Sequence, residues 1–221
     1  MAYSMINFQL IKTALPHLAH GALISLLIAA CSLCIGFGLG TVIALIQMAR
    51  NSFLNTCAYV YVTIMRGTPM LIHIVFLYYV FSLTGINISA LVVAIIAIGL
   101  NSGAYVSEII RAGINSVSKG QIEAAKTLGI KRRDVIRYII LPQAVRSVLP
   151  ALGNESITLI KDSSLASLIG VMELYKEGQI IMSQTYDALS VYCALALVYL
   201  CMTTSLSACI NLIEKRLQHH A

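Results

Sequence analysis

Charged residues are scarce in this sequence. Of its 221 residues, 11% are Asp, Glu, Lys or Arg, whereas 58% are hydrophobic. Soluble domains carry about a quarter charged residues, so the composition excludes an ordinary water-soluble domain. It predicts an all-α polytopic membrane protein, with room for about five helices of the ~20 apolar residues that a bilayer requires.

Patterns typical of enzymes are missing as well. The sequence contains no Gly-x-x-x-x-Gly-Lys-Ser/Thr phosphate loop, and its Ser, His and acidic residues form no recognisable hydrolytic set. Cys31 and Cys34 have the spacing of a redox or metal pair, but no second pair and no histidine accompanies them, so free thiols and no metal site are expected. We therefore expect a protein that is not an enzyme, whose energy source is a separate polypeptide or an ion gradient.

Five apolar stretches are separated by polar segments. They predict one transmembrane domain, residues 1–221, with spans at about 18–48, 55–83, 88–110, 148–172 and 188–213 and a polar loop at about 111–147. Residues 1–17 are mixed in character, and Pro16 suits the first turn of a helix. Gly36, Gly38 and Gly40 in the first span predict that another helix approaches closely there.

The second span is interrupted near its middle by Arg66-Gly67-Thr68-Pro69. A charge at mid-bilayer is costly and rarely faces lipid, and Pro69 cannot donate a hydrogen bond to the carbonyl of Met65. Backbone groups freed at membrane depth persist only where they line a cavity or lie inside protein. The break is therefore a candidate functional site that includes Arg66 and Thr68. The alternative is a structural kink whose arginine pairs with another helix.

Further polar residues interrupt the third and fourth spans. Asn101 lies within the third, and Glu108 and Arg111 share one face near its end, where they form a local ion pair or contact a ligand. Lys161 and Asp162 are adjacent in the centre of the fourth. Successive helical residues point about 100° apart, so these two charges cannot neutralise each other well. One of them is expected to turn inward to a partner or ligand.

Basic residues gather in the central loop. It holds or adjoins seven of the chain's fifteen: Lys119, Lys126, Lys131, Arg132, Arg133, Arg137 and Arg146. Short Lys/Arg-rich loops resist translocation, so this loop is expected to face the cytoplasm, together with Arg50, Lys215 and Arg216. Five spans then place the N-terminus outside and the C-terminus inside. The net charge of +6 is explained by this topology and by contacts with the lipid bilayer, and no nucleic-acid partner is expected.

Within the loop, residues 119–128 are expected to form a short helix with Ile122, Ala125 and Leu128 on its apolar face, and Gly129 permits a sharp exit. A second basic, amphipathic run, residues 132–141, ends at Pro142. Two interpretations remain open. The short helix is a knob that transmits a partner's motion to the flanking spans, or the loop is a juxtamembrane segment on anionic headgroups.

Four motifs occur in order along the chain: Arg66-Gly67-Thr68-Pro69, Asn101-Ser102-Gly103 through Ile114, Glu123-Ala124-Ala125 with Gly129, and Lys161-Asp162-Ser163-Ser164. Together they resemble the permeases of ATP-binding-cassette (ABC) importers of the polar amino acid uptake (His/Glu/Gln/Arg-type) family. The resemblance implies a type I importer fold of five transmembrane helices in the bacterial inner membrane. It also implies a homo- or heterodimer of permeases, a cytoplasmic ABC ATPase and an extracytoplasmic amino acid-binding protein. No cofactor would be bound by this chain, and ATP and Mg would be used by the partner ATPase.

The resemblance also implies roles for individual residues. A coupling helix seated on the ATPase would include Glu123, Ala124, Ala125, Leu128 and Gly129, and the membrane substrate site would include Thr68, Asn101 and Asp162. The zwitterionic nature of an amino acid requires both a cation or dipole and an anion or carbonyl. The candidate substrate-binding residues are therefore Arg66, Thr68, Asn101, Glu108, Lys161 and Asp162. Asp162 also suits a cationic side chain, which favours a basic amino acid.

Two other functional classes remain as alternatives. A gradient-driven secondary amino acid carrier or channel would use the same intramembrane charges but would transport without an ATPase. A membrane enzyme or assembly scaffold would need a reactive constellation or a soluble domain, and neither is evident. The chain has one central loop and no internal repeat, so a second copy is expected to supply the other half of a central path.

Overall fold

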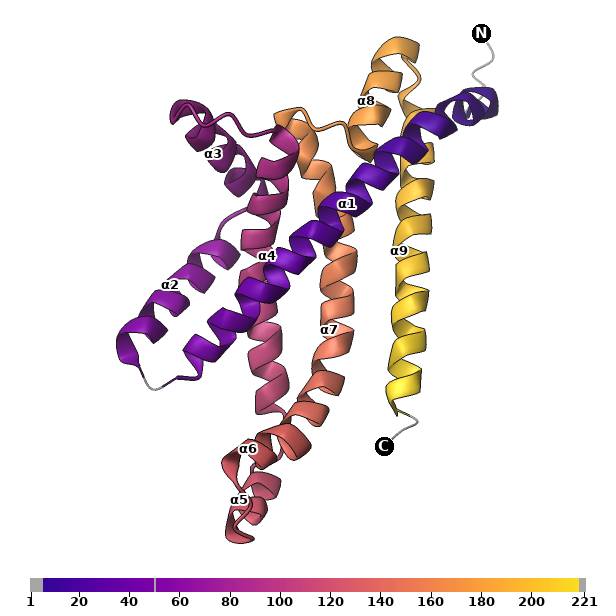
Figure 1. Cartoon of the computed structure of the whole chain (residues 1–221). Coiled ribbons are helices and arrows are strands. Elements are labelled where there is room, and N and C mark those ends of the chain that lie inside the picture. The colour runs from indigo at the N-terminus through magenta and orange to yellow at the C-terminus, as the bar shows by residue number, and fades with distance from the viewer. Residues whose placement is uncertain (1–5, 50, 219–221) are drawn as a thin grey trace.

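The computed structural model describes residues 6–49 and 51–218, and within these residues it consists of helices and short connections without strands (Figure 1). Residue 50, and with it the predicted inner position of Arg50, lies outside the described residues. The elements are α1 (Phe8–Gln47), α2 (Ser52–Gly67), α3 (Met70–Leu83), α4 (Ala90–Asn115), α5 (Lys119–Thr127), α6 (Arg132–Asp134), the π-helical η1 (Val135–Ile140), α7 (Leu141–Asp162), the 3-10 helix η2 (Ser163–Ile169), α8 (Leu174–Thr185) and α9 (Ala188–Gln218).

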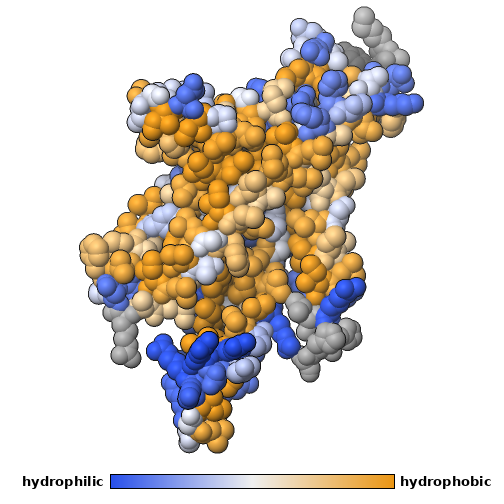
Figure 2. All heavy atoms as spheres, in the orientation of Figure 1, coloured by the Kyte–Doolittle hydropathy of each residue, from blue (hydrophilic) through white to orange (hydrophobic). Residues whose placement is uncertain are grey.

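Within residues 6–49 and 51–218, four helical stretches are long and apolar enough to cross a bilayer: α1, α4, the continuous stretch Arg132–Ile169 and Ala188–Arg216 of α9. The shorter α2 and α3 meet the same test together, as one span bent by 108°. In Figure 2 a hydrophobic band covers the middle of the visible face, and hydrophilic atoms gather toward its two ends. The predicted all-α polytopic fold is confirmed.

α1 starts earlier than the sequence pattern predicts, at Phe8 instead of near residue 18. Asn7 caps it, because the Asn7 side chain accepts a hydrogen bond from the Leu10 amide at 3.1 Å. Pro16 therefore lies inside the helix, and its predicted place in the first turn is wrong. The hydrogen bond lost at Pro16 is tolerated because Ala14 and Leu18, on either side of it, are buried in a cluster with α8 and α9.

α1 crosses α4 through small residues. A Cβ atom added to Gly36 would lie 2.7 Å from Ser102 Oγ, and one added to Gly40 would lie 2.8 Å from the Gly103 carbonyl oxygen. This spacing of four residues places both glycines on one helix face and lets the backbones approach closely. Gly38 has no neighbour within 4 Å of such an atom, so the close approach predicted for all three glycines holds only for Gly36 and Gly40.

The bend between α2 and α3 falls at the predicted break. α2 ends at Gly67, Thr68 has extended backbone angles (φ −124°, ψ 147°), and Pro69 precedes α3. Proline disfavours a helical conformation for the residue before it, which explains why Thr68 leaves the helix. The result is a short unwound segment beside α4.

Pro142, where the predicted basic run of residues 132–141 ends, does not interrupt the helical stretch. α6, η1 and α7 form one stretch in which Pro142 occupies the first turn of α7, directly after the π-helical residues. A π turn is wider than an α turn and bonds residues five apart, so it relieves the conflict between the proline ring and the preceding carbonyls. Much of the predicted 111–147 loop is consequently helical.

The predicted polar loop between the last two spans is mostly the helix α8. Glu173, its N-cap, accepts hydrogen bonds from the amides of Tyr175 and Lys176. In Figure 1, α8 lies beside the start of α1 at one end of the molecule, whereas α5, α6 and the end of α9 lie at the other.

Candidate functional site

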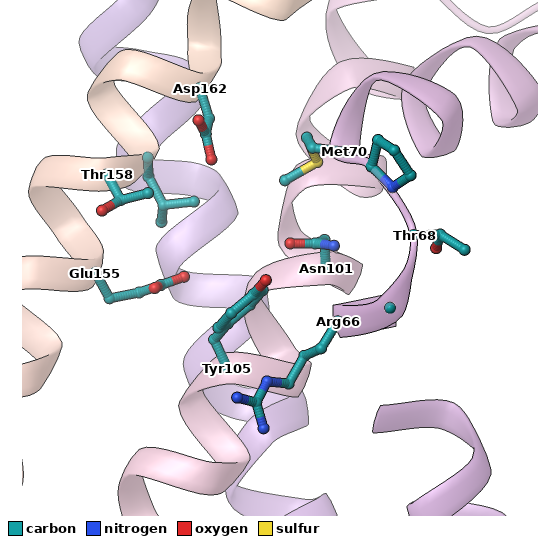
Figure 3. A pocket seen from close by; sticks show the side chains of 11 residues that line it. Arg66, Thr68, Met70, Asn101, Tyr105, Glu155, Thr158 and Asp162 are labelled. Carbon is teal, nitrogen blue, oxygen red and sulfur yellow. The ribbon is translucent and has the colours of Figure 1, made fainter. Parts of the chain in front are cut away.

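A cavity of about 610 Å³ lies where the α2–α3 break faces α4 and α7 (Figure 3). It is lined by Arg66, Gly67, Thr68, Pro69, Met70, Asn101, Tyr105, Glu155, Thr158, Leu159 and Asp162. We call it the break cavity. Four of the six predicted substrate-binding residues line it: Arg66, Thr68, Asn101 and Asp162.

Side chains satisfy the carbonyl groups that the break releases. The Asn101 amide donates to the Met65 carbonyl at 2.8 Å, in place of the hydrogen bond that Pro69 cannot make. The Thr68 hydroxyl donates to the Ile64 carbonyl at 2.6 Å. The unwound backbone is thereby held against α4, and it forms one wall of the break cavity.

Arg66 lines the break cavity, but its guanidinium turns away from Asp162 and lies beside Tyr105 (Figure 3). Its central carbon is 5.3 Å from the centroid of the Tyr105 ring, and its Nη1 is 3.9 Å from Oε2 of Glu108. Glu108 also forms the predicted ion pair with Arg111. Arg66 thus joins the break cavity to a second one of about 330 Å³, lined by Gln47, Asn55, Tyr59, Val62, Thr63, Arg66, Glu108 and Arg111. Glu108 therefore belongs to the second cavity only.

α7 contributes two carboxylates to the break cavity. Glu155, Thr158 and Asp162 are spaced by three and four residues, which places them on one face of the helix. The Ser102 hydroxyl on α4 donates to Glu155 Oε1 at 2.7 Å and fixes that carboxylate. Asp162 turns inward, whereas its neighbour Lys161 is exposed and lines neither cavity.

The charges around the break cavity are unbalanced. Glu155 and Asp162 face it, while Arg66, the one cationic residue in its lining, directs its guanidinium toward Glu108. Carboxylates inside a membrane require a counter-charge or hydrogen-bond donors. The arrangement is suited to bind a cationic group.

The predicted helix of the central loop is present as α5, at the far end of the molecule from α8 (Figure 1). Ala125 is buried, whereas Glu123, Ala124, Leu128 and Gly129 are exposed. Gly129 has a positive φ of 72°; its amide donates to Lys126, and the next amide, of Ile130, donates to Ala125. These two bonds form a Schellman motif, which ends α5 sharply and starts the chain toward α6.

Residues 36–219 match a family model described as "Binding-protein-dependent transport system inner membrane component". The chain belongs to this permease family. With its candidate membrane-spanning helices, membership indicates a multi-pass protein of the inner membrane. The resemblance to the permeases of ABC importers, which the four sequence motifs suggest, is confirmed.

Named relatives agree with this assignment. The permease is 38% identical to the probable amino-acid ABC transporter permease protein YckA of Bacillus subtilis (strain 168), over 97% of the chain and 95% of the relative. It is 36% identical to the glutamine transport system permease protein GlnP of Escherichia coli (strain K12), over 96% and 98%. Its fold matches a chain from the crystal structure of an amino acid ABC transporter with histidines, with a TM-score of 0.90, 37% identity and coverage of 96% and 99%.

Sequence reasoning missed three polar residues of the permease's break cavity: Tyr105, Glu155 and Thr158. Glu155 carried a usable signal, since it is an acidic residue within the predicted fourth span, where charge is costly. Tyr105 and Thr158 carried none, because such residues are ordinary in apolar helices. Their role depends on the bend between α2 and α3 lying opposite them.

Proposed function

We propose that this permease is the transmembrane subunit of an ATP-driven importer of amino acids, with a preference for a cationic side chain. The observation that carries the proposal is the pair of carboxylates, Glu155 and Asp162, in the break cavity. YckA, GlnP and the solved transporter are all named for amino acids or for glutamine, which supports the substrate class. The carboxylates favour a basic member of that class.

Both ends of an amino acid find complementary groups in this arrangement. Glu155 and Asp162 would attract the ammonium group and a cationic side chain, and the Arg66 guanidinium would donate to the carboxylate once it turns from Glu108 into the cavity. Both N–H groups of Asn101 already donate within the protein, so its side chain offers the substrate an oxygen acceptor. Thr68 also lines the cavity and adds a hydroxyl. Lys161 is exposed and Glu108 lines the second cavity, so neither is part of the proposed contact set.

The proposal includes three partners: a cytoplasmic ABC ATPase seated on α5, an extracytoplasmic amino acid-binding protein and a second permease subunit. α5 suits the first role because it is short and mostly exposed, and because it lies in the sequence between two helices, α4 and α7, that line the break cavity. α4, which carries Asn101, ends four residues before α5. The stretch Arg132–Ile169, which carries Glu155 and Asp162, begins five residues after it. A displacement of α5 would therefore move the α4 and α7 sides of the cavity.

Transport would follow from that connection. Closure of the ATP-bound ATPases would draw the two coupling helices together and open the path outward, so that an amino acid delivered by the binding protein enters. Hydrolysis would restore the inward-open state. The end that carries α5, α6 and the end of α9 would face the cytoplasm, because most of the exposed basic residues that the structure describes belong to these helices and the segments next to them.

The test is purification of the permease with its co-isolating ATPase and reconstitution into sealed vesicles. We expect arginine or lysine to stimulate ATP hydrolysis more than glutamate does. Glu155→Gln and Asp162→Asn should each raise the half-maximal concentration of the basic amino acid roughly tenfold or more, since a hydrogen bond to a charged group contributes about 1.5–3 kcal/mol.

Lys161→Gln is the matched control, because Lys161 adjoins Asp162 but lies outside the cavity. It should leave the half-maximal concentration unchanged. Uptake of the amino acid by vesicles that contain the permease without any ATPase would contradict the proposal and favour a gradient-driven carrier. Equal stimulation by glutamate and arginine would contradict the preference for a cationic side chain.

A further inference from the structure

A histidine outside the break cavity connects two of the residues that line it. His73 lies in the first turns of α3 and does not line the cavity. Its Nε2 is 2.5 Å from the Thr68 hydroxyl, and its Nδ1 is 3.1 Å from the Asn101 amide nitrogen. Thr68 belongs to the unwound segment and Asn101 to α4, so one imidazole bridges three elements.

One assignment of protons satisfies every contact in this network. The Asn101 amide has two N–H groups, of which one reaches the Met65 carbonyl and the other reaches His73 Nδ1, so Nδ1 accepts. The remaining ring nitrogen then carries the proton and donates to Thr68. The Thr68 hydroxyl, having accepted from His73, donates to the Ile64 carbonyl at 2.6 Å. A neutral imidazole protonated at Nε2 is therefore what the geometry requires.

This chain of hydrogen bonds supports the backbone where it is weakest. The carbonyls of Ile64 and Met65 belong to the last turn of α2, which the Pro69 break deprives of helical partners. Thr68 and Asn101 satisfy these carbonyls, and His73 fixes how both side chains are oriented. Without the ring, the second N–H group of the Asn101 amide loses its acceptor, and the Thr68 hydroxyl loses its donor.

We infer that His73 is a positioning residue for the substrate site, which acts through Thr68 and Asn101 and has no contact with the substrate. The inference rests on the proposed function, because it takes the break cavity as the place where the amino acid binds. It adds a specific requirement. The side chain at position 73 must offer an acceptor toward Asn101 and a donor toward Thr68 at the same time.

The two replacements of His73 that separate this role from simple packing are His73→Gln and His73→Leu. A glutamine carboxamide carries an acceptor and a donor on one planar group, as the neutral imidazole does. Leucine fills similar space without either. A positioning role predicts that glutamine retains the function and leucine loses it, whereas a packing role predicts that both are tolerated alike.

The first measurement is hydrogen–deuterium exchange in the purified permease–ATPase complex, over the peptide that covers residues 64–72. It needs no substrate. His73→Leu should raise the exchange rate of this segment roughly fivefold, and His73→Gln should leave it within about twofold of the wild type. Phe76→Leu is the control, because Phe76 lies on the same helix with 66% of its surface exposed. Unchanged exchange in His73→Leu would overturn the inference.

The second measurement is equilibrium binding of radiolabelled arginine to the same complex. His73→Leu should weaken binding roughly three- to tenfold while the maximal rate of ATP hydrolysis stays near that of the wild type. In a Thr68→Val, Asn101→Leu background, His73→Leu should not weaken arginine binding any further, because the two side chains through which His73 acts are already removed. A full additional loss in that background would overturn the inference.

The two failures are distinguishable. If exchange responds to His73→Leu but arginine binds to no variant, the wild type included, the substrate assignment fails and the support of the break by His73 stands. If arginine binds to the wild type but His73→Leu changes neither the hydrogen-exchange rate nor the affinity for arginine, the inference fails and the proposed function stands.

Discussion

Glu173 has no exposed surface, and four hydrogen-bond donors point at its carboxyl group. The amides of Tyr175 and Lys176 lie at 2.9 and 2.8 Å, and the hydroxyls of Ser25 and Tyr199 each lie at 3.2 Å. The residue thus joins α1, α8 and α9. Replacement by glutamine changes one acceptor oxygen into an NH2 group that faces a donor, and a buried unsatisfied group costs about 1–3 kcal/mol.

We therefore expect Glu173→Gln to lower the midpoint of thermal unfolding of the complex. Size-exclusion chromatography of samples heated to increasing temperatures measures this midpoint. Glu177→Gln on the same helix should have little effect, since its partner His20 is 68% exposed and 4.0 Å away.

Burial raises the pKa of the Glu173 carboxyl above its ordinary 4.5, and the four donors offset this only in part. A raised pKa means stability that is fully present below pH 4.5 and is lost as the pH rises through the higher folded value. The advantage of the wild type over Glu173→Gln should accordingly shrink as the pH rises, and a growing advantage would contradict this assignment.

Individual residues were predictable from the sequence where an unusual side chain interrupts an apolar run. Arg66, Asn101 and Asp162 stand out in this way, and the structure brings them to one cavity. Glu173 falls in the polar segment between the last two predicted spans, and the sequence does not indicate its burial, because that depends on α8 packing against α1 and α9. His73 could not be singled out, because its role exists only after the bend places it beside Thr68 and Asn101.

At the scale of a helix, α5 depends on how it ends. Gly129 holds a positive φ of 72°, which residues with a side chain adopt at a cost, so Gly129→Asp strains the turn between α5 and α6. Glu123→Lys leaves that turn intact and reverses the charge of an exposed position. Both should abolish stimulation of ATP hydrolysis by the transported amino acid while the permease still inserts into the membrane. Glu214→Lys makes the same change in charge near the end of α9 and should keep stimulation. Reconstituted uptake at the wild-type rate in Glu123→Lys would exclude α5 as the coupling element.

Helix existence was more predictable than helix limits. Apolar runs indicated α1, α4, α7 and α9, and the Arg66–Pro69 segment indicated the bend between α2 and α3. The limits depend on local compensation that composition does not reveal. α1 extends to Phe8 past Pro16 because its start is capped by Asn7 and packed against α8 and α9. The helix through Pro142 continues because a π turn precedes it.

At the scale of the whole molecule, hydrophilic residues gather at two ends separated by an apolar band (Figure 2). One end carries α5, α6 and the end of α9, with Lys131, Lys215 and Arg216 exposed, and the other carries α8. Since basic segments are retained in the cytoplasm, this asymmetry predicts which end is inside. The same orientation is required for α5 to meet an ATPase, so the topology and the mechanism are subject to one test.

That test uses two cysteine reporters of matched exposure in a background whose six native cysteines are replaced. Gln184→Cys lies on α8 and Lys131→Cys lies at the start of α6, and both wild-type side chains are exposed. A membrane-impermeant maleimide added to intact spheroplasts should label the first and not the second. Permeabilisation should make Lys131→Cys as reactive as Gln184→Cys, which shows that the membrane and not local structure had protected it. Labelling of Lys131→Cys in intact spheroplasts would place α5 on the outer surface, where it cannot meet a cytoplasmic ATPase, and would contradict the coupling mechanism and the topology together.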